Sequence, residues 1–97
     1  MTDKELLELA AKAAGVGYAD KEGKFVPFVP ETWNPLTDDG DALRLAVKLK
    51  FVIRHWDDCV DVGYFASPRQ KEMYGGDPYA ATRRAIVRAA AQIRGTL

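Results

Sequence analysis

The only histidine and the only cysteine of this chain lie four positions apart, at His55 and Cys59. A thiol within hydrogen-bond reach of an imidazole can act as a nucleophile activated by a general base. The two aspartates at 57 and 58 predict a two-residue turn between two strands. The side chains of His55 and Cys59 would then point to opposite faces of the hairpin, because neighbouring residues of a strand alternate. We therefore predict no catalytic dyad, and no enzyme activity.

Three carboxylates, at Asp38, Asp39 and Asp41, form the next group that could do chemistry. A calcium loop needs oxygen ligands at alternate positions, a central glycine and a distal glutamate, and this stretch lacks that pattern. Acidic residues are also favoured at the start of a helix, where they cap it and meet its dipole. We interpret the group as a cap with Thr37 or Asp38 at the N-cap position, and we predict no metal and no cofactor.

The positive charges of the chain are concentrated in its second part. Residues 1–40 carry a net charge of −4 and residues 41–97 a net charge of +4, so the whole chain is neutral. Arg83, Arg84, Arg88 and Arg94 belong to the last predicted helix. The two ends of the chain could pair electrostatically, or the arginines could present a basic face to an acidic partner. No nucleic-acid-binding motif accompanies them, so nucleic acid is the less favoured partner.

Three segments of the chain carry the signals of a helix start. Thr2 and Glu5 have the spacing of a capping box, and Gly15 is placed to end the helix that follows. Asp77 followed by Pro78 is a common combination at a helix start. The predicted helices cover residues 3–14, 38–49 and 78–95.

The middle predicted helix, 38–49, has the widest apolar face. On a helical wheel its apolar side chains cover more than half of the circumference, from Ala42 to Leu49, while Arg44 and Lys48 share a narrow strip. A helix of this kind should contact the core along most of its length. We therefore predict that it is the most buried helix, around which the other elements are organised.

Strand signals lie between the predicted helices. Residues 17–28 predict a hairpin with an edge strand at Pro27, and residues 50–56 and 59–65 predict two more strands that place Arg54 opposite Asp61. One face of this second hairpin is apolar, and the other is partly polar and is either covered or a binding surface. The fold prediction is α+β: three helices layered on an antiparallel sheet of about four strands, in one domain over 1–97.

Two segments between these elements are candidates for binding a partner. The proline-broken stretch around Trp33 places an aromatic ring either as a lid on the core or as an exposed anchor. Residues 66–76 lack a periodic pattern and end in two glycines, so we predict a mobile segment. The predicted partner-binding residues are the aromatic and basic side chains outside the strong core pattern: Trp33, Arg69, Lys71, Tyr74, Arg84 and Arg88.

Composition limits where the chain acts. Its 97 residues contain 47% hydrophobic residues and a single cysteine, which fits one globular domain in a reducing compartment. No apolar run approaches the ~20 residues that span a bilayer, and no signal peptide precedes the first helix. We expect a cytoplasmic protein that does not bind membranes. Its oligomeric state stays open.

Three blocks of the sequence resemble small bacteriophage and prophage proteins of the phage ABA sandwich domain family. They are the helix start from Asp3 to Gly15, the stretch from Trp33 to Leu49 and the closing block from Asp77 to Ala91. The resemblance implies helices layered on a central antiparallel sheet. It supplies no catalytic residues.

A phage origin implies a host as the place of action and host components as targets. The first hypothesis is a protein that binds and inhibits a host protein or nucleoprotein complex, such as an anti-CRISPR or other anti-defence factor. The second is a sponge that binds nucleic acid or a nucleotide signal. The third is a self-associating accessory module of the phage.

Overall fold

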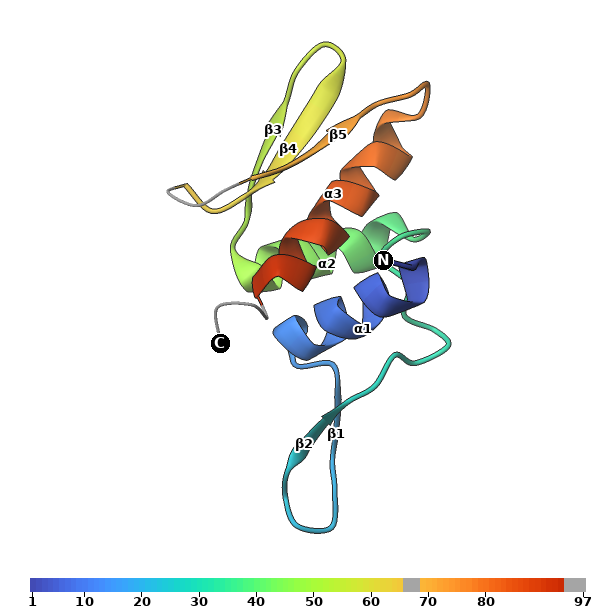
Figure 1. The fold of residues 1–97 in the computed structure, drawn as a ribbon, viewed down its shortest axis with the longest axis vertical. Coiled ribbons are helices and arrows are strands. Elements are labelled where there is room, and N and C mark those ends of the chain that lie inside the picture. Colours follow the sequence, from blue (N-terminus) through green and yellow to red (C-terminus); the bar gives the residue numbers. More distant parts are fainter. Residues whose placement is uncertain (66–68, 94–97) are drawn as a thin grey trace.

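The computed structural model describes residues 1–65 and 69–93 and is an α+β fold, as predicted (Figure 1). Its strands number five and form two antiparallel sheets, where we expected about four in one sheet. In chain order the elements are α1 (Asp3–Ala14), β1 (Gly17–Ala19), β2 (Phe25–Pro27), α2 (Asp39–Leu49), β3 (Val52–His55), β4 (Cys59–Gly63), β5 (Gln70–Met73) and α3 (Pro78–Ile93).

All three predicted helix starts are confirmed. The capping box at α1 is complete, with Thr2 Oγ1 accepting from the amide of Glu5 at 3.1 Å, and Gly15 ends the helix with a φ of 72°. The side chains of Asp38 and Asp77 each accept a hydrogen bond from the amide three residues later, at 2.8 and 3.1 Å. Short-range signals were sufficient here because a cap involves only residues within one helical turn.

The central helix of the fold is α3, not α2, so our prediction that α2 is the most buried helix is wrong. The three-stranded sheet packs on one side of α3, and α1 and α2 pack on the other (Figure 1). The buried residues of α3 surround much of the helix and are mostly small: Ala81, Ala85, Ile86, Val87, Ala89, Ala90 and Ala91. Small side chains allow neighbouring elements to approach closely from several directions.

On α2 only one stripe faces the core. Ala42, Leu45 and Ala46 are buried, whereas Leu43 is 60% and Val47 is 67% exposed. The helical wheel counted all five as core residues because it records hydrophobicity and not the position of neighbouring elements. The exposed pair therefore becomes available for other roles.

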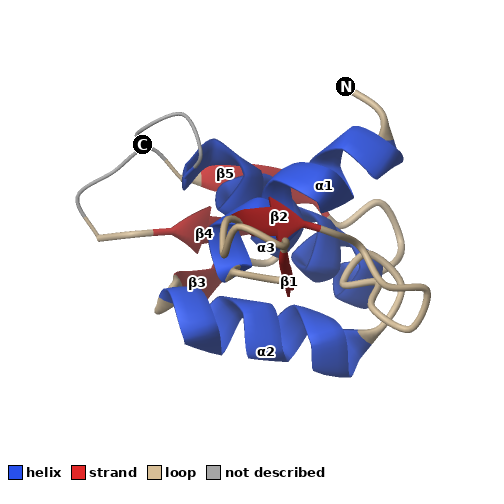
Figure 2. Cartoon of the chain, turned by 90° about the horizontal axis from the view of Figure 1, so that it is seen from below, coloured by secondary structure: helices blue, strands red, loops and turns tan. Residues whose placement is uncertain are grey.

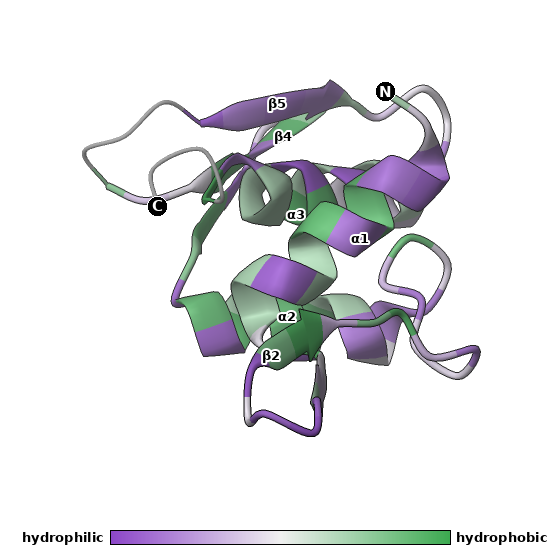
Figure 3. Cartoon of the chain, turned by 60° about the horizontal axis from the view of Figure 1, so that its bottom comes forward, coloured by the Kyte–Doolittle hydropathy of each residue, from purple (hydrophilic) through white to green (hydrophobic). Residues whose placement is uncertain are grey.

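The three-stranded sheet has the order β3-β4-β5. The predicted register of its first hairpin is confirmed, with His55 opposite Val60 and Arg54 opposite Asp61. Part of the predicted mobile segment 66–76 is instead β5, and residues 66–68 of that segment lie outside the described residues. The β5 sequence Gln-Lys-Glu-Met is predominantly hydrophilic (Figure 3). It lacks the β-branched residues by which we recognised the other strands.

The two faces of this sheet differ in burial. Val60 and Val62 are fully buried on the face that packs against α3. On the opposite face Trp56 and Met73 are more than half exposed. The partly polar face of the hairpin is therefore only partly covered by the residues that the structure describes.

The β1–β2 hairpin projects from the end of the molecule opposite the three-stranded sheet (Figure 1). The predicted hairpin over 17–28 is confirmed, with Gly17 opposite Pro27. Gly17 is required by close packing: a methyl group at its Cα would overlap the carbonyl oxygen of Val26 and lie 2.9 Å from the ring of Phe25.

We expect Gly17→Ala to lower the free energy of unfolding by about 1–3 kcal/mol, because overpacked positions cost that much. Hydrogen exchange of the Phe28 amide, which donates to the Val16 carbonyl at 3.1 Å, should also become faster. Ala19→Ser, at an exposed position of the same strand, is the matched control and should leave both quantities unchanged. Equal behaviour of the two variants would contradict the close-packing argument.

Ion pairs join the two parts of the chain that have opposite net charge. Arg83 pairs with Asp39 at 2.6 Å, and Arg84 pairs with Asp3 at 2.8 Å. The Arg83 guanidinium also donates to the Leu36 carbonyl at 2.8 Å, which fixes the loop before α2. Electrostatic pairing within the chain, one of our two interpretations of the charge distribution, is therefore confirmed.

Candidate protein-binding surface

The six residues that we predicted to bind a partner do not form one exposed surface. Trp33 and Tyr74 are partly buried and pack against the hydrophobic core. The Tyr74 hydroxyl also shares a hydrogen bond of 2.9 Å with Nδ1 of His55. The structure thus favours the lid interpretation of Trp33 over that of an exposed anchor.

Arg69 is largely buried and bonds to both β3 and β4. Its guanidinium forms an ion pair with Asp61 and donates to the carbonyl oxygens of Val52 and Asp61, at 2.6 and 3.1 Å. Only 12% of its side chain is exposed. Lys71, two residues later on β5, is exposed. Of these two predicted residues, Lys71 is therefore the one with a free surface.

Arg84 and Arg88 both form ion pairs with carboxylates of the same chain. Arg84 pairs with Asp3 at the start of α1, and Arg88 pairs with Glu72 on β5. Their side chains are each 39% exposed. Together with Arg83 they attach α3 to its neighbours, which leaves less positive charge for an external phosphate.

His55 and Cys59 lie on opposite faces of the β3–β4 hairpin, as the predicted register requires. His55 is exposed at the rim of the sheet, whereas Cys59 is buried. Burial raises the pKa of the Cys59 thiol, and the hydrogen bond with Asp58 raises it further. A thiol with a raised pKa is a poor nucleophile.

Asp61 is the centre of the polar network on the outer sheet face. Arg54 donates to it at 3.0 Å, Trp56 at 3.1 Å, and Arg69 forms an ion pair with it. Burial alone would raise the pKa of Asp61, but these three donors outweigh burial and lower the pKa to about 2. Arg54 lies on β3, Trp56 follows β3, and Arg69 directly precedes β5. Through Asp61 on β4, the network therefore connects all three strands of the sheet.

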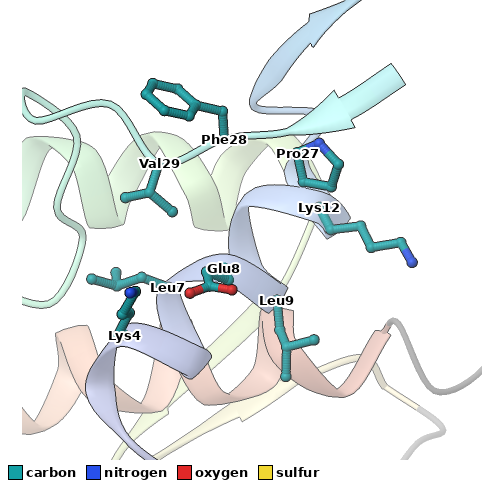
Figure 4. A pocket seen from close by; sticks show the side chains of 8 residues that line it. All are labelled: Lys4, Leu7, Glu8, Leu9, Lys12, Pro27, Phe28 and Val29. Carbon is teal, nitrogen blue, oxygen red and sulfur yellow. The ribbon is translucent and has the colours of Figure 1, made fainter. Parts of the chain in front are cut away.

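A groove of about 700 Å³ lies between α1 and the segment that leaves β2 (Figure 4). Its lining is largely apolar, with Leu7 on α1 facing the segment that contains Phe28 and Val29. Lys4 and Lys12 lie at its edges, and neither forms an ion pair within the described residues. We call this surface the hairpin groove; its lining residues are Lys4, Leu7, Glu8, Leu9, Lys12, Pro27, Phe28 and Val29.

Exposed aromatic rings extend the hairpin groove along the hairpin. Tyr18 and Phe28 are each about half exposed, and their rings pack edge to face with centroids 6.1 Å apart. Phe25 is exposed on the other face of the same hairpin. Sequence reasoning missed this surface. The available signal was three aromatic residues in a two-stranded hairpin, which has too little surface to bury them.

Among residues 1–65 and 69–93, no group of three or more His, Cys, Asp or Glu side chains could hold a metal ion. The same part of the chain contains no helix whose length and apolar character would let it cross a membrane.

Comparison of the chain with protein families, with curated proteins and with solved structures gives no match in any of the three. The resemblance to the phage ABA sandwich family therefore stays a prediction.

Proposed function

We propose that this chain acts by binding another protein, and that the hairpin groove is the surface it uses. The observation that carries the proposal is the half-exposed ring of Phe28 beside an open apolar groove. Exposed apolar surface of this kind is typical of protein-binding sites, and aromatic residues contribute much of the binding energy when they are desolvated.

The resemblance to phage proteins supplies the class of target. We propose a host protein or a nucleoprotein complex, whose activity is blocked when the groove is occupied; an anti-defence role is one form of this proposal. Lys4 and Lys12 form no ion pair within residues 1–65 and 69–93 and outnumber Glu8, the one acid among the lining residues of the groove. They therefore favour a target segment that combines apolar and acidic residues. A nucleic-acid or nucleotide sponge is less favoured because Arg84 and Arg88 already pair with carboxylates.

The proposal predicts that Phe28→Asp abolishes most target capture from a host lysate. A charged side chain at a desolvated aromatic contact should weaken binding at least tenfold. The matched control is Val47→Asp on α2, which places the same charge at another exposed apolar position. The measurement is the amount of each host protein retained by the two variants and by the unmodified chain, with and without nuclease treatment.

Two results would contradict the proposal. Equal loss of capture in both variants would mean that the hairpin groove has no special role. Retained material that consists of nucleic acid and disappears after nuclease treatment would favour the sponge.

A further inference from the structure

The outer edge of β3 has backbone groups that pair with no residue in the described part of the chain. The Trp56 amide donates to the Cys59 carbonyl at 2.8 Å, and pairing alternates along an antiparallel ladder. Arg54 therefore directs its backbone groups toward β4, while Ile53 and His55 direct theirs away from β4. Within the described residues, no other group hydrogen-bonds to these outward amides and carbonyls. The edge thus offers two donors and two acceptors to an additional strand.

A second groove, of about 470 Å³, lies beside this edge, between β3, α2 and the first half of α3. Figure 2 shows α2, β3, β4 and β5 in succession, so the free edge of β3 faces the side on which α2 lies. Most side chains that line the groove are apolar, including Ile53 and Ile86. Leu43 and Tyr79 at its rim are 60% and 72% exposed. We call it the β3 groove.

On the outer face of the sheet, one row of residues that crosses β5, β4 and β3 has alternating charges. Lys71 lies opposite Asp61, and Asp61 lies opposite Arg54. Arg69 also pairs with Asp61, so this single carboxylate is shared by two guanidinium groups. The row therefore has excess positive charge at β3, and a carboxylate in the next strand would continue the alternation.

We propose that the outer edge of β3 binds an extended segment of a partner protein as an added antiparallel strand, with the pattern apolar–acidic–apolar. The two apolar residues would lie opposite Ile53 and His55 and direct their side chains into the β3 groove. The acidic residue between them would lie opposite Arg54 on the outer face. This mode of binding uses backbone hydrogen bonds for affinity and alternate side chains for specificity.

A second copy of this chain is a poor occupant of the same edge. The antiparallel register that uses all of these outward backbone groups pairs Ile53 of one copy with His55 of the other. It would place two Arg54 side chains directly opposite each other, and opposed like charges are destabilising. The β3 groove is a second binding surface, separate from the hairpin groove, and the two grooves share no lining residue.

The probe for this proposal is a displayed library of random nine-residue peptides, selected on the full chain. We expect the selected peptides to share the apolar–acidic–apolar pattern. In a titration followed by nuclear magnetic resonance, a synthetic selected peptide should slow hydrogen exchange of the Ile53 and His55 amides. Replacing its acidic residue by lysine should weaken binding about threefold to fivefold, as expected for one cross-strand ion pair. Arg54→Gln should remove this difference.

The matched variants are Leu43→Asp at the rim of the β3 groove and Val47→Asp one turn later on α2, outside it. Leu43→Asp should weaken peptide binding at least tenfold, and Val47→Asp should leave it unchanged. Failure to select the pattern, or equal binding by the two variants, would overturn the proposal. Peptides that lose affinity with Phe28→Asp instead would also overturn it, while supporting the hairpin groove as a binding surface.

Discussion

Leu45→Ala should lower the free energy of unfolding by about 2–5 kcal/mol, the range found when a large buried aliphatic side chain is truncated in a core. Leu45 is 3% exposed and belongs to the core cluster in which α2 meets α3. Truncation removes its apolar contacts and leaves a cavity that neighbouring helices fill only in part. Denaturation by urea, with the midpoint and the slope both measured, gives the change directly.

The control for this prediction lies on the same helix. Leu43→Ala removes the same atoms from a side chain that is 60% exposed, so we expect a loss below about 1 kcal/mol. Comparable losses in the two variants would mean that α2 does not pack with the stripe that we describe. A small loss for both would mean that α2 contributes little to the core.

Asp61→Asn should lower the free energy of unfolding by about 2–4 kcal/mol, because it removes a carboxylate that two guanidinium groups and an indole share. The amide keeps the size of the side chain but loses the charge. Arg69, 12% exposed, would then keep a largely desolvated charge without its partner. The matched control is Asp57→Asn in the exposed turn of the same hairpin, which should change stability little.

The pH dependence of stability gives a second test of Asp61. Its pKa is about 2 in the folded chain, below the ordinary value of 3.8, so folding favours the charged carboxylate. The stability from this group is therefore fully present above about pH 4 and is lost as the pH falls toward 2. Asp61→Asn should show a smaller loss of stability over that window than the unmodified chain. Equal losses would assign the acid sensitivity to other carboxylates.

The two proposed surfaces follow from one property of the core. The buried residues of α3 are mostly alanines, so the sheet, α1 and α2 can all pack closely against this helix. The apolar residues that the core does not use remain outside it, on α2 at Leu43 and on the hairpin at Phe28. The test variant of the hairpin groove is Phe28→Asp and that of the β3 groove is Leu43→Asp, so either surface can fail without the other.

Local features of the fold could be predicted from the sequence. The helix caps at Thr2, Asp38 and Asp77 and the turn between His55 and Cys59 depend on residues close together in the chain. Their energies are decided within one turn of helix or one pair of strands. The absence of a His55–Cys59 pair follows from the same local register.

The positions of the arginines and the choice of the central helix were decided only by the tertiary structure. In the sequence Arg69 and Arg84 look like free surface charges. In the structure Arg84 pairs with Asp3, at the other end of the chain, and Arg69 pairs with Asp61 on β4. Periodicity identifies which side of a helix is apolar but not which element covers it. Neighbours brought together by folding therefore determined that α3 is buried, that α2 keeps an exposed apolar side, and that a hydrophilic segment became β5.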